Sequence, residues 1–347
     1  MSIQKFSISR DPDLYEAWPD VVLTDAGTLV CVFSECIHHT NREYTRIMLT
    51  ESADRGRTWS PRRPLTEGTR GLPHLYNCAR IAKLPDGRLA VTVDRVPSSG
   101  EHKSDAFSVV CLYFSSDNGK TWSEAAETPL RGIVPDKLTV LESGRWIIAA
   151  HRKTDEKLTE YLRYSDDAGK TWSGEVLVAH DPRYNLCEGS LLDAGGGNLV
   201  MFLRENSATG LPCMKVISHD SGEHWSPVYE FPIPGCHRPT AGFLRDGHLL
   251  ITCRMRHGGA GWLGLYTQNL LAALSDRDSA LLEADRGAWS RILPVDYDRS
   301  KLADTGYSGW VQFPDGEIYV VNYIVDDWID KAQIRGYSLH MTDFILE

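Results

Sequence analysis

The chain has 347 residues, of which 42% are hydrophobic and 24% charged, and its formal net charge is −10. This composition is typical of a globular protein, and the acidic excess disfavours non-specific nucleic-acid binding, which needs a positive surface. No apolar run approaches the roughly 18 residues that cross a bilayer, and the first residues lack the apolar core of a signal peptide. We therefore expect a cytoplasmic protein with no membrane contact.

The predicted elements begin with a strand over 4–9, followed by six hairpins with tight turns. The turn glycines lie at 27, 87, 144, 197, 247 and 316, and each precedes a β-rich run such as 28–33 or 317–321. Asp-Gly between apolar runs is a strong hairpin signal. The spacing of 50–69 residues between turns fits about four strands and their loops. The only helical periodicity is over 268–282.

A second repeat, Ser-x-Asp-x-Gly-x-Thr-Trp, alternates with these turns. Copies begin at Ser52, Ser115, Ser165 and Ser218, and a worn copy spans 284–289. We expect the Asp to accept backbone N–H bonds within a turn, the Gly to adopt a positive φ, and the Trp ring to be buried between neighbouring repeats. The repeat is thus predicted to be structural rather than catalytic.

Six four-stranded units predict an all-β fold, a six-bladed β-propeller with Asp-box turns that forms one domain over 1–347. The strand at 4–9 would complete the last blade and close the ring. The eight cysteines include no Cys-x-x-Cys pair, which indicates reduced, buried thiols. No dense group of ligand residues points to a metal, and we expect no cofactor.

Counting from the turn glycines predicts which side chains surround one mouth of the central channel. Nine residues before each glycine lie Trp18, Cys78, Pro135, Glu188, Arg238 and Tyr307. Seven residues after each glycine lie Ser34, Asp94, His151, Arg204, Arg254 and Tyr323. Sequence neighbours of these positions add further charged or titratable groups, among them Arg80, Asp136, His237 and Arg256. A basic rim on an acidic protein favours an anionic or polyhydroxylated ligand, whereas arginines paired with carboxylates would be ordinary rim ion pairs.

The Asp-box repeats and the sixfold pattern resemble the sialidase (neuraminidase) superfamily over nearly the whole chain. Tyr307-Ser308 resembles the sialidase nucleophile in its context, and Glu188-Gly-Ser followed by Arg204 resembles the catalytic Glu and the second arginine of the carboxylate-binding triad. The resemblance implies that Glu188 takes the phenol proton of Tyr307, because a phenol with a pKa of about 10 is otherwise a poor nucleophile.

The chain departs from the sialidase pattern at three places. Ala17 occupies the position of the first triad arginine, and 258–264 contains no arginine for the third. Arg238, Arg254 or Arg256 could substitute. The loop 36–42 lacks the usual acid/base aspartate, so Asp94 or His39 would serve.

The leading hypothesis is an exo-acting glycoside hydrolase that removes a terminal, acidic sugar from an oligosaccharide or glycoside. Its catalytic residues would be Tyr307, Glu188, and Asp94 or His39, and its anion-binding residues Arg204, Arg238 and Arg254. One alternative is a polysaccharide lyase or a hydrolase of uronate or rhamnose units, which would use His151, His237, Tyr307 and Arg238. The other is a non-catalytic glycan-binding propeller. The oligomeric state is left open.

Overall fold

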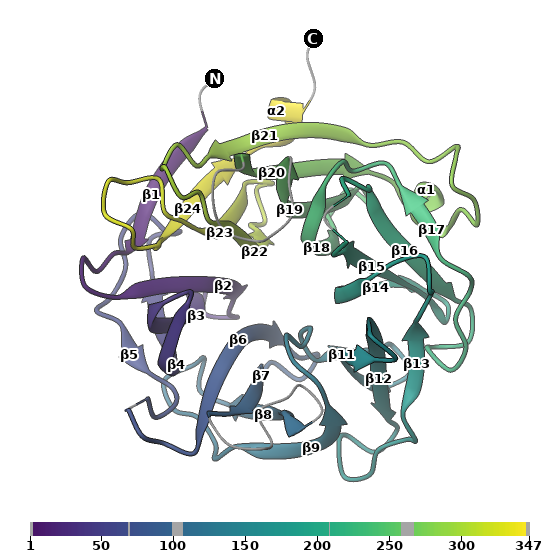
Figure 1. Cartoon of the computed structure of the whole chain (residues 1–347), viewed down its shortest axis with the longest axis horizontal. Coiled ribbons are helices and arrows are strands. Elements are labelled where there is room, and N and C mark those ends of the chain that lie inside the picture. Colours follow the sequence, from purple (N-terminus) through teal and green to yellow (C-terminus); the bar gives the residue numbers. More distant parts are fainter. Residues whose placement is uncertain (1–2, 69, 99–106, 208, 258–266, 345–347) are drawn as a thin grey trace.

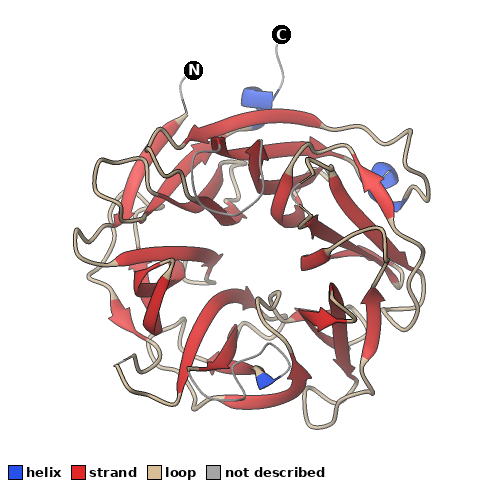
Figure 2. Cartoon of the chain, viewed as in Figure 1, coloured by secondary structure: helices blue, strands red, loops and turns tan. Residues whose placement is uncertain are grey.

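The computed structural model describes residues 3–68, 70–98, 107–207, 209–257 and 267–344. Six four-stranded antiparallel sheets are arranged as blades around a central axis (Figure 1). Strands dominate every blade, and two short helices, α1 (Arg277–Leu281) and α2 (Met341–Phe344), lie at the periphery (Figure 2). The predicted six-bladed propeller is confirmed.

In each blade the chain runs outward from the strand nearest the axis. Blade 1 contains β2 (Tyr15–Leu23), β3 (Leu29–His38), β4 (Asn41–Ser52) and β5 (Arg63–Pro64). Blade 2 contains β6 (His74–Lys83), β7 (Leu89–Pro97), β8 (Val109–Ser115) and β9 (Ala126–Arg131). Blade 3 contains β10 (Thr139–Val140), β11 (Trp146–Thr154), β12 (Lys157–Ser165) and β13 (Val176–Ala179). Blade 4 contains β14 (Leu186–Gly195), β15 (Asn198–Glu205), β16 (Cys213–Ser218) and β17 (Tyr229–Phe231). Blade 5 contains β18 (Cys236–Phe243), β19 (Leu249–His257), β20 (Thr267–Ser275) and β21 (Arg291–Tyr297). Blade 6 contains β22 (Thr305–Gln312), β23 (Ile318–Ile324) and β24 (Gln333–Leu339), and its outermost strand is β1 (Gln4–Ser9).

The hydrophobic core is divided among the interfaces between blades. Five of the six clusters of buried apolar side chains in the described residues each join two neighbouring blades; Val30 of blade 1 packs with Ile81 of blade 2, for example. The last cluster joins Tyr15 and Phe33 of blade 1 to Tyr319 of blade 6. Burial of one such side chain contributes about 1.5–3 kcal/mol, so the stability of the ring resides in contacts between blades. All eight cysteines are free and buried.

The four Asp-box repeats form hydrogen-bonded turns at these interfaces. In the second copy, the Asp117 carboxylate accepts the backbone N–H of Thr121 at 2.9 Å and its hydroxyl at 2.6 Å. The indole of Trp122 donates to the Gly119 carbonyl at 2.9 Å and packs against the cluster between blades 1 and 2. The four box tryptophans are half-buried rather than enclosed, because each turn lies at the outer edge of its interface.

The predicted helix over 268–282 is wrong for most of its length. Residues 267–275 form β20, which pairs with β19 on one side and β21 on the other. The run Leu270–Leu274 is apolar on both faces because both faces are buried, and such a run has no period that separates strand from helix. Only α1 is helical, capped by Asp276, which accepts the Ser279 N–H. No helix in the described ranges has the length and apolarity to span a bilayer.

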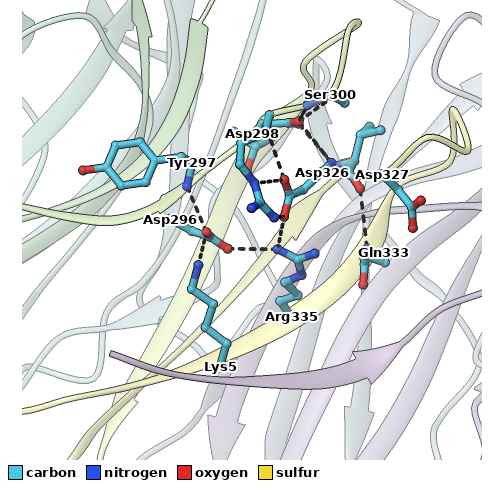
Figure 3. A network of polar contacts seen from close by, with 12 residues as sticks. Lys5, Asp296, Tyr297, Asp298, Ser300, Asp326, Asp327, Gln333 and Arg335 are labelled. Atoms are coloured by element: carbon cyan, nitrogen blue, oxygen red, sulfur yellow. Dashed lines mark hydrogen bonds and ion pairs between the residues drawn. The ribbon is translucent and has the colours of Figure 1, made fainter. Parts of the chain in front are cut away.

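The ring closes as the sequence predicts, because β1 pairs antiparallel with β24 from Gln4↔Ser338 onward. Side chains tie this closing blade to blade 5 (Figure 3). Asp296 of β21 accepts hydrogen bonds from Lys5 of β1 and, at 3.2 Å, from Arg335 of β24. Arg335 also contacts Asp326 at 2.8 Å. Beside them, Asp298 accepts the backbone N–H of Asp326 at 3.0 Å and of Asp304 at 2.9 Å. The closing network thereby fixes the start of the innermost strand of blade 6.

Candidate active site

The innermost strands share a bulge that aims one side chain into the central channel. Pairing with the second strand is interrupted between residues 17 and 20, 77 and 80, 187 and 190, 237 and 240, and 306 and 309. The first unpaired residue in each bulge has a positive φ. These residues are Trp18, Cys78, Glu188, Arg238 and Tyr307. Each such conformation costs about 1–3 kcal/mol in a non-glycine residue, and bulges re-aim side chains beside functional sites.

Blade 3 deviates in a way that its sequence explains. The equivalent position is Pro135, whose ring fixes φ near −65°. The left-handed conformation is therefore found one residue earlier, at Val134, with φ 49°. Val134 rather than Pro135 consequently faces the channel.

A pocket of about 250 Å³ lies over these bulges. Seven of the twelve predicted rim residues line it, namely Trp18, Cys78, His151, Glu188, Arg204, Arg254 and Tyr307. Its other walls are formed by residues that the counting rule does not select: His39, Arg42, Asn77, Ile133, Val134, Leu158, Cys187 and Asn206.

Tyr307, Glu188 and Arg204 form a buried chain of hydrogen bonds on one side of this pocket. The Tyr307 hydroxyl donates to Glu188 Oε1 at 2.5 Å, and Arg204 Nη1 lies 2.8 and 2.9 Å from the two carboxylate oxygens. Burial raises the pKa of Glu188, but the Arg204 charge, the charge that His151 carries at low pH, and the Tyr307 hydrogen bond outweigh it and hold that pKa at about 2. Burial and the Glu188 charge raise the pKa of Tyr307 well above 10. The resting pair is thus a neutral phenol and a carboxylate.

His151 supports this chain from blade 3. The backbone N–H of Glu188 donates to His151 Nδ1 at 3.3 Å, which assigns the ring proton of the neutral imidazole to Nε2. Burial lowers the pKa of His151 to about 4, so the ring is uncharged at neutral pH and adds no positive charge to the pocket.

Asp304 is the centre of a second buried cluster, on the blade 6 side. Its carboxylate accepts the Tyr15 hydroxyl at 2.5 Å and the Tyr323 hydroxyl at 2.9 Å, and it is hydrogen-bonded to His39 Nδ1. Arg254 Nη1 is 3.5 Å away. Burial raises the pKa of Asp304, but His39 and Arg254 together bring it below its usual range. Asp304 is therefore an anion that orients the His39 ring at the pocket wall.

Three of the predicted substrate-binding residues form a plug under the pocket instead of lining it. Arg238 donates to the carbonyls of Gly189 and Pro135 at 2.7 and 3.0 Å, and Asp136 lies 3.9 Å from it. Arg80 of blade 2 bonds the carbonyls of Pro19 and Ser308, both at 3.1 Å. These contacts join blades across the axis, and they occupy the guanidinium groups with protein acceptors.

The remaining predicted residues lie behind the pocket wall. Asp94 is fully buried and accepts a hydrogen bond from Asn77 at 3.3 Å, and burial raises its pKa to about 6. His237 and Arg256 are buried on β18 and β19, outside the pocket lining, and burial lowers the pKa of His237 far below its usual value. The segment 258–264, where the third triad arginine was sought, lies outside the described residues.

Sequence reasoning missed Asp304 and Arg42. Asp304 lies three residues before Tyr307, but the counting rule reached only the bulge positions. Arg42 is the second residue of β4 and the last residue of the segment 36–42 that was searched for an aspartate. Its guanidinium lies over the Trp18 ring, 4.1 Å from the centroid. The segment 36–42 begins at the end of the second strand of blade 1, at the predicted mouth of the channel, and this position could have identified its arginine as a pocket residue.

A family model described as the BNR repeat-like domain matches residues 76–320, more than half of the chain. The chain belongs to this BNR family. No curated protein matches the sequence significantly.

Solved structures share the propeller fold of this BNR protein at low identity. A protein of unknown function from Dyadobacter fermentans matches with a TM-score of 0.78 and 20% identity over 98% of both chains. The intramolecular trans-sialidase from Ruminococcus gnavus matches with a TM-score of 0.71 and 14% identity over 96% of both. An α-L-arabinofuranosidase from Fusarium graminearum matches with a TM-score of 0.64 and 13% identity over 98% of both. The fold is therefore the six-bladed propeller found in sialidases and in another glycosidase.

Proposed function

We propose that this BNR protein is an exo-acting glycoside hydrolase that removes a terminal, acidic sugar from an oligosaccharide or glycoside. The observation that carries the proposal is the 2.5 Å hydrogen bond from the Tyr307 hydroxyl to Glu188 in the wall of the pocket. A neutral phenol beside a carboxylate is a nucleophile and base pair that avoids charge repulsion with an anionic substrate. The sialidases and the arabinofuranosidase among the structural matches support glycosidic substrates.

The reaction follows from this geometry. Tyr307 Oη attacks the anomeric carbon while its proton passes to Glu188, and the bond to the aglycone oxygen breaks. His39, which lines the pocket and is oriented by Asp304, donates the proton that the departing oxygen needs. Water then cleaves the tyrosyl–sugar bond: His39 accepts the proton of the water, and Glu188 returns its proton to Tyr307.

Arg204 has a supporting role in this scheme. Its guanidinium holds both oxygens of Glu188 and also bonds Asn206 at 2.6 Å. The ion pair keeps Glu188 ionised and fixed, so that the carboxylate can accept the phenol proton as the new bond forms.

The test is a panel of chromogenic glycosides that includes sialosides, uronides and arabinofuranosides, assayed with the wild type and Tyr307→Phe. We expect Tyr307→Phe to fold normally and to lose at least about a thousandfold in kcat. Tyr229→Phe, in the outer strand β17, is the matched control and should retain full activity. A difluoro analogue of the sugar that is turned over should label Tyr307, as read by peptide mass spectrometry.

More than about a tenth of the wild-type rate in Tyr307→Phe would overturn the proposal. Release of an unsaturated uronate, detected by its ultraviolet absorbance, would identify a lyase instead.

A further inference from the structure

The cations that line the pocket differ in what neutralises them. Arg204 is paired with Glu188. Arg254 faces Asp304 and donates to the Thr305 carbonyl at 3.1 Å. Within the described part of the chain, Arg42 makes no hydrogen bond or ion pair, and its Nε, like that of Arg204 and Arg254, is buried without a hydrogen-bond partner. The Arg42 charge helps to lower the pKa of the buried Asp94, but no carboxylate in the described residues lies within ion-pair distance of it. Arg42 is thus the arginine in the lining of the described pocket that no carboxylate contacts directly.

The position of Arg42 is nevertheless defined. It begins β4 next to the loop that carries His39, and its guanidinium lies on the Trp18 ring at 4.1 Å. Trp18 is itself held in the first bulge and contacts His39 edge-on, with ring centroids 5.0 Å apart. Stacking on an indole face orients a guanidinium but leaves its in-plane N–H donors available to a ligand.

We infer that Arg42 recognises the negative charge of the substrate, a single carboxylate on the terminal sugar. A planar guanidinium fits a carboxylate through two parallel N–H bonds. Arg204 and Arg254 already contact the carboxylates on which Tyr307 and His39 depend, whereas Arg42 contacts none in the described residues. The inference rests on the proposed function in taking the bound ligand to be a sugar, and it places the charge contact on blade 1, across the pocket from Arg204.

The experiment measures binding rather than turnover, by calorimetric titration with sodium D-glucuronate, sodium N-acetylneuraminate and D-glucose. We expect the wild type to bind at least one acidic sugar more tightly than D-glucose. Arg42→Gln should weaken that acidic sugar about tenfold or more and change D-glucose less than about twofold. Arg42→Lys should retain part of the preference for the acidic sugar, because lysine keeps the positive charge but lacks the two parallel N–H donors of a guanidinium.

Arg70→Gln is the matched control, because Arg70 pairs with Glu43, the residue next to Arg42, and is exposed. It removes one positive charge near the same loop and should leave all affinities unchanged. A thermal unfolding curve of Arg42→Gln that matches the wild type would show that the variant is folded.

Three outcomes would overturn the inference: acidic-sugar affinity that survives Arg42→Gln, an equal loss in Arg70→Gln, or a wild type that does not prefer any acidic sugar. None of them depends on catalysis. Failure of the proposed hydrolase is read separately, from the rate of Tyr307→Phe.

Discussion

The phenol of Tyr307 and the carboxylate of Glu188 differ in pKa by many units, although they share a 2.5 Å hydrogen bond. A free tyrosinate therefore does not accumulate in the resting site. In the proposed reaction, the phenol proton has to move to Glu188 in the same step in which the oxygen bonds to the sugar, because only then does the phenol oxygen lose its basicity. The short contact prepares that transfer, and Arg204 prevents Glu188 from being protonated beforehand.

In the proposed mechanism, a histidine as proton donor implies an acidic working range. Burial lowers the pKa of His39, and the Asp304 charge offsets this only in part, so the pKa lies below the ordinary 6.5. As the pH increases, we expect kcat/KM to rise near pH 2, where Glu188 ionises. At higher pH it should decrease again as His39 loses its proton, and the midpoint of this decrease should lie below pH 6.5. His39→Gln should remove this falling limb and cost about 10²–10⁴-fold on a poor leaving group.

Two comparisons make this pH prediction specific. Glycosides of 4-nitrophenol need little protonation on departure, and His39→Gln should lose far less activity on them. Asp94 has a carboxyl pKa of about 6 and is the other candidate donor. If the falling limb persists in His39→Gln and disappears in Asp94→Asn, the proton donor is Asp94.

At the scale of the turn, an Asp-box links two blades. The Trp122 ring packs against residues of blades 1 and 2, and the turn is held by Asp117. Trp122→Ala should lower the free energy of unfolding by about 3 kcal/mol, the low end for an aromatic residue because the ring is half-buried. Activity should fall only in proportion to unfolded protein. Chemical denaturation monitored by circular dichroism measures the change.

The control for this variant is Trp328→Ala, since the Trp328 side chain is 90% exposed. Its free energy of unfolding should change by less than about 0.5 kcal/mol. A fully stable Trp122→Ala protein with lost turnover would contradict the structural role of the turn.

The hairpins explain why so much of the fold is readable from the sequence. A tight turn fixes the pairing register of its two strands, so counting from the glycine found Glu188, Tyr307, Arg204 and His151 in one pocket. The same count does not predict whether the side chain at a bulge points up into the pocket or down into the plug. Arg238 points into the plug, although its position is equivalent to that of Tyr307. Asp304 lies just before β22 and Arg42 is the second residue of β4, and neither position is reached by counting along the hairpin of the two inner strands. The strand β20 was misread because its two faces are equally apolar.

For the molecule as a whole, the plug under the pocket joins blades that are not neighbours. Arg80 of blade 2 reaches Thr240 of blade 5 at 3.1 Å and lies 3.3 Å from Asp20 of blade 1. Arg80→Met would leave Asp20 buried without this cation, so we expect a loss of about 3–5 kcal/mol in unfolding free energy with KM unchanged. Denaturation curves and steady-state kinetics measure both quantities.

Arg88→Met is the comparison for this variant, because the Arg88 side chain is 38% exposed and, in the described residues, forms its ion pair with the nearby, exposed Asp86. It also lies over the Phe114 ring, 5.4 Å from the centroid. It should alter stability by less than about 0.5 kcal/mol. A raised KM with unaltered stability in Arg80→Met would assign Arg80 to the ligand instead.

The pairing of β1 with β24 also has a consequence for biosynthesis. The strand at 4–9 leaves the ribosome long before its partner at 333–339 exists, and until then its edge is unpaired. Blade 6, which carries Tyr307 and Asp304, is the blade assembled from both ends of the chain. Under the proposed mechanism, a nascent chain with five finished blades therefore has no complete catalytic centre, because the proposed nucleophile Tyr307 belongs to the blade that β24 and β1 complete. Turnover by this protein would report that the ring has closed.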